Sequence, residues 1–254
     1  MHIETLGHGP DLILIHGWAM HAGIFAPLTR ELAPHFRLHL VDLPGHGYSR
    51  DSDTHLRLDE CALQLAEQLP SATWLGWSLG GQVCLEAARL RPDRVEALVL
   101  IASSPRFVVG EDWPQGVAPD LFRQFADGLR SDYHRTIERF LALEAIGSEH
   151  AQSELRELRA QVFARGEPAL NVLCDGLGIL DSADLRDVLP GLRAPSLWIA
   201  GRRDKLIPPA AMQWAAQHSP GGRYLELSAG HAPFIGHAAR VAEAVLELQR
   251  EQAA

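Results

Sequence analysis

The chain is poor in cysteine, has no excess of positive charge and contains no long apolar run. Its three cysteines, Cys61, Cys84 and Cys174, are far apart and odd in number, which argues against a disulfide framework and favours a reducing compartment. The formal net charge of −9 excludes the basic footprint of nonspecific nucleic-acid binding and gives no attraction to an anionic membrane surface. No apolar run approaches the ~20 residues of a membrane span, and the first residues lack the pattern of a signal peptide. We therefore expect a cytoplasmic protein with no membrane or nucleic-acid partner.

What the sequence does contain is a regular alternation of strand-like and helix-like segments over 254 residues. Apolar residues make up 46% of the chain, which is enough for a sizeable core in one α/β domain. Short runs rich in Val, Ile and Leu predict strands that are buried on both faces, at residues 12–15, 38–41, 73–75, 97–101, 196–200 and 223–227. Because helix-like patterns separate these runs, the sequence predicts a mostly parallel central sheet flanked by helices, which is an α/β fold.

The alternation stops between residues 106 and 190. This stretch is rich in helix formers, contains no convincing strand and has prolines near both ends, such as Pro105 and Pro190. We interpret it as an all-helical cap, residues 106–190, inserted into an α/β core that consists of residues 1–105 and 191–254. The chain shows no coiled-coil heptads and no obvious interface stripe, so we expect a monomer.

The segment Gly76-Trp77-Ser78-Leu79-Gly80 matches G-x-S-x-G between a predicted strand and a predicted helix. This motif forms a strained turn that projects the serine hydroxyl above the sheet as a nucleophile. The alternative is an ordinary serine cap at the N-terminus of a helix. The strand–turn–helix context favours the nucleophile.

A serine hydroxyl is a weak nucleophile, so it needs a base and a group that orients that base. In this fold the expected chain order is Ser, then Asp or Glu, then His. Asp204 and His231 follow that order, each in a loop after a predicted strand, where the carboxyl ends of parallel strands meet. The alternatives are a turn acid paired with Arg202 or Arg203, and one surface-loop histidine among the 13 in the chain. Order and placement together favour a catalytic triad with Ser78.

Acyl transfer also needs donors for the oxyanion, usually two backbone N–H groups. One is expected from the residue after the nucleophile, Leu79, and the other from the loop after an early strand. There the segment "LILIHGW" ends in Gly17 and Trp18, so we predict the Trp18 N–H as the second donor. We expect His16 to support this loop rather than to act as a base.

Several segments together resemble the α/β-hydrolases, namely "LILIHGW", "VDLPGHGYSR", "GWSLGG", "GRRDKLIP" and "GHAPFIGHA". Others resemble one branch, the pimeloyl-[acyl-carrier protein] methyl ester esterase family of biotin biosynthesis, namely "EDWPQGVAPD", "RTIERFLALEAIGSE" and "GILDSADLRDVLPGLRAPSLWIAG". The likeness runs over nearly the whole chain, including the cap. It implies an α/β-hydrolase fold and a carboxylesterase that hydrolyses the methyl ester of pimeloyl-[acyl-carrier protein] to the free acid and methanol.

The resemblance also implies roles for residues of this chain. By matched motif, Ser78 is the nucleophile, His231 the base and Asp204 the acid of an acyl-enzyme mechanism that needs neither a metal nor an organic cofactor. "FLALE", residues 140–144, matches a segment that lines the substrate passage. The residues expected to contact substrate are Trp18, Ser78, Leu79, Phe140, Leu141, Ala142, Leu143, Glu144 and His231. For any single cap side chain, sealing the cap onto the core is at least as good an explanation.

The partner that the resemblance implies is an acyl-carrier protein. Carrier proteins are acidic, and two arginine pairs of the cap are spaced to share helix faces: Arg135 with Arg139, and Arg156 with Arg159. Arginine suits the recognition of carboxylates and phosphates through bidentate pairing. The alternative is ordinary pairing with glutamates of the same cap, and Gln152 stands where the family pattern has another basic residue.

Other proteins on the same scaffold supply the alternatives to this function. Haloalkane dehalogenases and epoxide hydrolases attack with an aspartate at the elbow, so Ser78 argues against both. A general short-acyl carboxylesterase, or a serine hydrolase of carbon–carbon bonds, would use the same triad and differ only in the cap and its partner. A non-catalytic binding protein is a more distant alternative, because all three triad members are present.

Overall fold

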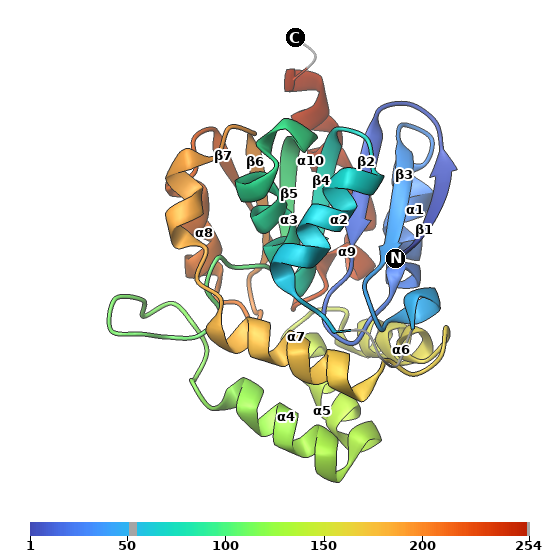
Figure 1. The fold of residues 1–254 in the computed structure, drawn as a ribbon, viewed down its shortest axis with the longest axis vertical. Coiled ribbons are helices and arrows are strands. Elements are labelled where there is room, and N and C mark those ends of the chain that lie inside the picture. Colours follow the sequence, from blue (N-terminus) through green and yellow to red (C-terminus); the bar gives the residue numbers. More distant parts are fainter. Residues whose placement is uncertain (51–54, 253–254) are drawn as a thin grey trace.

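The computed structural model describes residues 1–50 and 55–252 and has a seven-stranded sheet at its centre (Figure 1). The strand order is β1-β3-β2-β4-β5-β6-β7. The strands are β1 (His2–Gly7), β2 (Asp11–Ile15), β3 (Arg37–Asp42), β4 (Ala72–Trp77), β5 (Val95–Ile101), β6 (Ser196–Gly201) and β7 (Gly222–Leu227). Only β1 runs antiparallel to its neighbour, and the remaining pairs are parallel. The predicted α/β class with a mostly parallel sheet is confirmed.

All six predicted strands are present, and a seventh strand, β1, was not predicted from the sequence. This strand lies at the edge of the sheet and pairs only with β3. Its exposed His2, Glu4 and Thr5 leave just two apolar residues, Ile3 and Leu6, which do not alternate with period two. An edge strand with one solvated face carries no continuous apolar run, so the pattern that identifies the central strands does not identify it.

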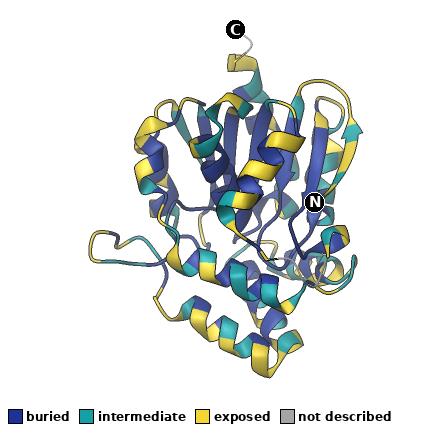
Figure 2. Cartoon of the chain, viewed as in Figure 1, coloured by how far each residue is buried: buried dark blue, intermediate teal, exposed yellow. Residues whose placement is uncertain are grey.

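Helices cover both faces of the sheet, which explains why the central strands are apolar throughout (Figure 2). In Figure 1 α2 (Leu58–Gln68) and α3 (Leu79–Leu90) lie on the face toward the viewer, with α1 (Ala26–Leu32) and α10 (Ala238–Gln252) behind the sheet. Helix α8 (Pro209–Gln217) packs on β6 and β7. The short elements are η1 (Ala22–Phe25), η2 (Gly47–Ser49), η3 (Pro92–Arg94), η4 (Arg186–Gly191) and α9 (Pro233–Gly236). No helix in the described part of the chain combines the length and apolar character that crossing a membrane requires.

Four helices lie between β5 and β6 in the chain and form a layer at the carboxyl ends of the strands (Figure 1). They are α4 (Leu121–Ser131), α5 (Tyr133–Ala145), α6 (Ala151–Val162) and α7 (Leu170–Ser182). Helix α4 buries Phe122, Phe125 and Leu129, which helical spacing places on one face, and it packs on α5 and α7. In the described part of residues 106–190, β-pairing is limited to the isolated bridges Val108–Val117 and Gly110–Trp113.

Candidate active site

Ser78 stands on a sharp turn between β4 and α3. Its backbone has φ 54° and ψ −117°, a conformation that costs a non-glycine residue about 1–3 kcal/mol and that surrounding contacts must hold. The Ser78 N–H donates to the Ile101 carbonyl (2.9 Å), and the Ser103 hydroxyl donates to the Ser78 carbonyl (2.7 Å). The side chain makes no capping hydrogen bond to α3, so the alternative of a simple helix cap is wrong.

Glycines flank Ser78 because the strand and the helix approach each other too closely for side chains. A Cβ atom on Gly76 would lie 2.4 Å from the Gly80 carbonyl oxygen, and one on Gly80 would lie 2.2 Å from the Ile15 carbonyl oxygen. Such distances force the backbone apart. The glycines of the motif therefore let α3 pack directly against β4 and β2.

Ser78, His231 and Asp204 form one continuous chain of hydrogen bonds. Ser78 Oγ lies 2.9 Å from His231 Nε2, and His231 Nδ1 lies 2.8 Å from Asp204 Oδ2. In the consistent proton arrangement, Nδ1–H donates to the carboxylate and Nε2 accepts from the serine hydroxyl. All three side chains are buried, so water does not compete for these bonds. His231 is therefore not a surface-loop histidine.

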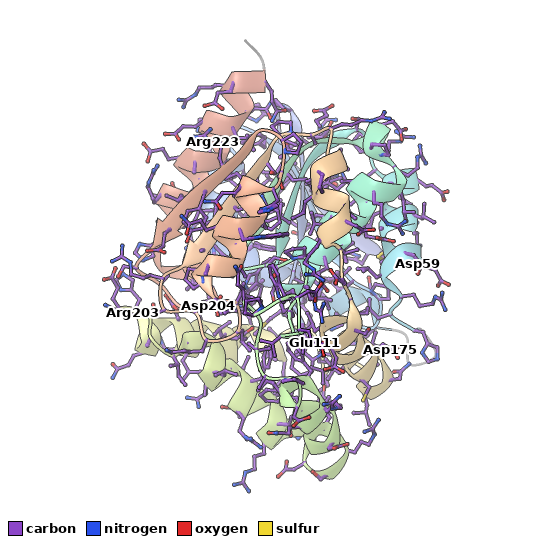
Figure 3. The ribbon with its side chains drawn as sticks, turned by 90° about the vertical axis from the view of Figure 1, so that its left-hand side faces the viewer. Asp59, Glu111, Asp175, Arg203, Asp204 and Arg223 are labelled. Atoms are coloured by element: carbon purple, nitrogen blue, oxygen red, sulfur yellow. The ribbon has the colours of Figure 1, made fainter. Side chains whose placement is uncertain are left out.

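The Asp204 carboxylate is held by its own loop, after β6. Its Oδ1 accepts from the N–H groups of Leu206 (2.8 Å) and Ile207 (3.0 Å), which leaves Oδ2 for His231. Arg202 pairs instead with a glutamate on β7, and Arg203 donates to a backbone carbonyl after α5. Figure 3 shows Asp204 where the loop after β6 meets the α4–α7 layer. The alternative of a turn acid paired with either arginine is thus wrong.

The loop after β2 lies against the serine turn. A Cβ atom on Gly17 would lie 3.3 Å from Ser78 Cβ and 3.1 Å from the Trp77 ring, so only a glycine lets this backbone come so near. The N–H groups of Trp18 and Leu79 donate to no other described residue. Each is therefore a free backbone donor. Trp18 precedes Ser78 in the chain, and Leu79 follows it directly.

His16 fixes this loop and is neutral. Its Nδ1–H donates to the Gly17 carbonyl (2.7 Å), and its Nε2 accepts from the Leu43 N–H (3.0 Å). Burial, with a smaller effect from the nearby His46, lowers the pKa of His16 to about 3. A neutral imidazole with both nitrogens engaged is a structural support, as the sequence analysis expects, and cannot serve as a free base.

Helix α5 carries the predicted substrate segment, residues 140–144, to the site. The Phe140 ring packs on the Trp18 indole, with centroids 4.5 Å apart, and the indole N–H donates to the Leu173 carbonyl on α7 (2.8 Å). Trp18 thus connects the loop after β2 to α5 and α7. Leu141 is buried, whereas Ala142 and Leu143 are partly exposed.

Glu144 is the least expected member of this segment. The residue is only 1% exposed, and its Oε2 has no hydrogen-bond partner among the described residues. Burial raises the pKa of the Glu144 carboxyl well above its usual range, and the negative charge of Asp204 adds to the increase. The Glu144 carbonyl accepts from the His231 N–H (3.0 Å). Helix α5 therefore contacts the backbone of the predicted base, which no sequence pattern indicates.

The four predicted docking arginines are exposed on α5 and α6. Arg159 forms an ion pair with Glu138 (2.8 Å), so the alternative of ordinary pairing holds for this residue. Arg135, Arg139 and Arg156 have no ion pair with another described residue. These three guanidinium groups are free to meet an external anion.

Strained backbone gathers around the site. The described non-glycine residues with positive φ are Ala19, Ser78 and Ala102. They follow β2, β4 and β5, the three neighbouring strands at the centre of the sheet. The sequence analysis identified only Ser78 among them, since nothing distinguishes an alanine in a strained turn from any other alanine.

Solved structures of other proteins share the fold of this chain. An enol-lactonase from Burkholderia xenovorans LB400 superposes with a TM-score of 0.86 at 23% identity and covers 98% of this chain and 96% of its own. An esterase from Exiguobacterium antarcticum superposes with a TM-score of 0.86 at 21% identity, over 97% of this chain and 94% of its own. At such identities the likeness establishes the fold alone.

Sequence comparison is more specific. The profile of the alpha/beta hydrolase fold family matches residues 10–238. A pimeloyl-[acyl-carrier protein] methyl ester esterase from Xanthomonas campestris pv. campestris (strain B100) is 54% identical over 96% of this chain and 97% of its own length. One of the same name from Stenotrophomonas maltophilia (strain R551-3) is 55% identical over 96% of this chain and 95% of its own length. This chain therefore belongs to the α/β-hydrolase fold family and, within it, to the pimeloyl-[acyl-carrier protein] methyl ester esterases.

Proposed function

We propose that the chain hydrolyses the methyl ester of pimeloyl-[acyl-carrier protein] and releases methanol and the free carboxylate in biotin biosynthesis. The observation that carries the proposal is the buried chain of hydrogen bonds from Ser78 through His231 to Asp204 in this protein. The protein is itself a member of the esterase family. A serine hydrogen-bonded to a histidine, which is hydrogen-bonded in turn to a carboxylate, supplies the nucleophile, the base and the orienting group of acyl transfer.

In the first half-reaction, Ser78 Oγ attacks the ester carbonyl carbon while His231 Nε2 removes the hydroxyl proton. The imidazolium that forms is stabilised by Asp204, which also keeps Nδ1 protonated so that Nε2 is available. The tetrahedral intermediate collapses as His231 gives its proton to the departing methoxy oxygen. Methanol leaves, and the acyl group remains on the serine.

Backbone donors stabilise the charge that develops on the carbonyl oxygen. The N–H groups of Trp18 and Leu79 are free, and Gly17 packs against Ser78. We assign both as oxyanion donors, each of which is worth about 10²–10³ in kcat in comparable sites. They are preorganised, since His16 fixes the loop after β2 and α3 begins at Leu79.

In the second half-reaction, His231 removes a proton from water, and the resulting hydroxide attacks the acyl carbon. Collapse of this second intermediate returns the proton to Ser78 Oγ and frees the carboxylate. The acyl chain would lie along residues 140–144 of α5 beneath Trp18, in a passage between the core and a cap formed by α4–α7. The Phe140–Trp18 contact supports this placement, because it brings α5 beside the loop that carries the Trp18 oxyanion donor.

The carrier protein would bind outside, on the exposed arginines of α5 and α6. Arg135, Arg139 and Arg156 support this role best, because Arg159 already pairs with Glu138. Free guanidinium groups suit both acidic side chains and a phosphate. The three unpaired cysteines support a reducing compartment, and we accordingly propose that the protein acts in the cytoplasm. We also propose that it is a monomer, because its sequence has no coiled-coil heptads or obvious interface stripe.

The direct test offers purified protein two substrates in parallel, methyl-pimeloyl-carrier protein and a free short-chain methyl ester. Mass spectrometry follows the loss of the methyl group, and Ser78→Ala serves as the control. We expect Ser78-dependent cleavage with kcat/KM much higher for the carrier-linked ester. Cleavage of the free ester alone would make the chain a general esterase, and turnover by Ser78→Ala would refute the mechanism.

A charge reversal tests the docking surface. The double variant Arg135→Glu/Arg139→Glu should lower kcat/KM for the carrier-linked ester at least ~10-fold, because charges at the rim of an interface act on the encounter with the partner. The kcat/KM for the free ester should change by less than ~2-fold, because this ester brings no carrier protein. A matched control is Arg240→Glu/Arg250→Glu, which reverses two exposed arginines on α10. Equal losses on both substrates, or equal losses in the control, would contradict docking at α5.

A further inference from the structure

Away from the triad, Glu149, His150 and His237 bring three metal-ligating atoms together. Their ligand atoms all lie within 4.8 Å of one another. Glu149 Oε1 lies 3.5 Å from Nε2 of His237 and 3.9 Å from Nε2 of His150, and the imidazole centroids are 5.3 Å apart. Within residues 1–50 and 55–252, no other group of three or more His, Cys, Asp or Glu residues is arranged in this way.

The three residues come from two separate parts of the chain. Glu149 and His150 precede α6, whereas His237 stands between α9 and α10. Helix α6 packs on α9. The cluster therefore lies where the α4–α7 layer meets the core, six positions along the chain from His231.

Hydrogen bonds and close packing fix the backbone around the cluster. The Ser148 hydroxyl accepts from the His150 N–H (3.1 Å) and donates to Glu154 Oε1 (2.6 Å). A Cβ atom on Gly236 would lie 2.7 Å from His150 Cδ2 and 3.1 Å from Glu154 Oε1. Glycine at this position thus lets the end of α9 pack closely against both side chains.

Two buried polar atoms at the cluster have no hydrogen-bond partner among the described residues. One is His237 Nε2, and the other is Oε2 of Glu154, a residue with no exposed surface. Buried polar atoms in folded proteins almost always have a hydrogen-bond partner or a ligand. A cation bound by His237 Nε2 would satisfy the first, and its positive charge and bound water would offer a partner to the second.

We propose that Glu149, His150 and His237 bind one Zn²⁺ ion, with water as the fourth ligand. Two imidazoles and a carboxylate form a known ligand set for zinc, whose donors lie ~2.0–2.2 Å from the metal. Tetrahedral donors at that range are ~3.3–3.5 Å apart, so the Glu149–His237 pair already fits. The Glu149–His150 pair must close by about half an ångström. Both of these side chains are about half exposed, at 45% and 46%, and are free to do so.

The zinc would be a structural ion that cross-links the segment before α6 to the residue after α9. The ester hydrolysis proposed above uses only Ser78, His231, Asp204 and backbone donors, so the ion takes no part in the bond-making steps. An ion that binds the folded chain and not the unfolded one stabilises the fold by RT ln(1 + c/Kd), where c is the concentration of the free ion, so the stabilisation grows with the logarithm of c once c exceeds Kd. The proposal does not depend on the proposed function, since its readout is metal binding.

The test is isothermal titration of untagged, chelator-treated protein with Zn²⁺, together with thermal unfolding at increasing zinc concentration. We expect one zinc per chain and a Tm that rises with zinc. Single variants His150→Gln, His237→Gln and Glu149→Gln should each weaken binding at least ~10-fold, because loss of even an outer-shell partner typically weakens a site ~10–100-fold. Zinc K-edge absorption spectroscopy should report two imidazoles and one carboxylate.

His134→Gln is the matched control, because His134 is also an exposed cap histidine beside a glutamate (2.8 Å from Glu167) but has no third ligand. It should bind zinc as the wild type does. Circular dichroism of the metal-free variants checks that each is folded. Absence of zinc binding, binding that survives His150→Gln and His237→Gln, or equal weakening by His134→Gln would each overturn the proposal. Binding of Cu²⁺ or Ni²⁺ without Zn²⁺ would overturn the choice of metal.

Discussion

The buried carboxyl of Glu144 gives the protein a pH-dependent stability that one substitution removes. Burial raises its pKa in the folded state, whereas a glutamate in an unfolded chain has a pKa of about 4.3. Between these two values the folded protein binds one more proton than the unfolded protein. Linkage therefore makes the free energy of unfolding decrease by up to ~1.4 kcal/mol per pH unit. The stabilisation is fully present below pH ~4.3 and is lost as the pH rises through the folded-state pKa.

Glu144→Gln keeps the shape and removes the titration. Relative to the wild type, the variant should gain stability as the pH rises, by about 1–4 kcal/mol in total between pH ~4.3 and 7. The buried amide adds an offset that does not change with pH, so the slope is the readout. Urea unfolding at a series of pH values and constant ionic strength measures it.

The control for this experiment is Glu111→Gln, which changes a glutamate that is exposed in the folded protein and hydrated in both states. The stability difference from the wild type should rise with pH much more steeply for Glu144→Gln than for Glu111→Gln. A flat difference for Glu144→Gln would refute the reasoning. A difference that falls with pH would mean that Glu144 is an ionised and compensated carboxylate in the folded protein.

Two further substitutions test the site and the turn that builds it. Asp204→Asn should lower kcat for ester hydrolysis by ~10⁴-fold, because an amide does not hold His231 in the tautomer with a free Nε2. A steady-state assay at saturating ester measures kcat. A change confined to KM would contradict the prediction. Gly80→Ala places a methyl group 2.2 Å from the Ile15 carbonyl oxygen and should destabilise the fold by about 1–3 kcal/mol. The matched control is Gly178→Ala on α7, where no atom lies within 4 Å of an added Cβ. It should stabilise the fold by about 0.5–1 kcal/mol. Urea unfolding compares the two variants, and equal effects would show that close approach is not the reason for Gly80.

Local features made much of this molecule predictable. The central strands are covered on both faces, so each is a continuous apolar run that the sequence displays directly. The serine turn could also be predicted, because G-x-S-x-G is a local motif and Gly76 is needed for contacts with Gly80 and Gly81, close to Ser78 in the chain. The contact that requires Gly80, with the Ile15 carbonyl on β2, is visible only in the tertiary structure. The edge strand β1 was missed for the opposite reason, since its polar residues face solvent.

The sequence by itself determined the α/β class and the nucleophile turn, because both depend on residues that are neighbours in the chain. It also displayed the order of serine, acid and base, because each of these residues follows a recognisable strand. Only the tertiary structure decided which side chains meet. His231 reaches Ser78 across 153 positions and Asp204 across 27, and packing of α5 on the loop after β7 turned Glu144 from one helical residue among many into a buried acid. In the same way, packing of α6 on α9 brought His237 close to Glu149 and His150. Burial and charge environment depend on distant segments, so no local pattern records them.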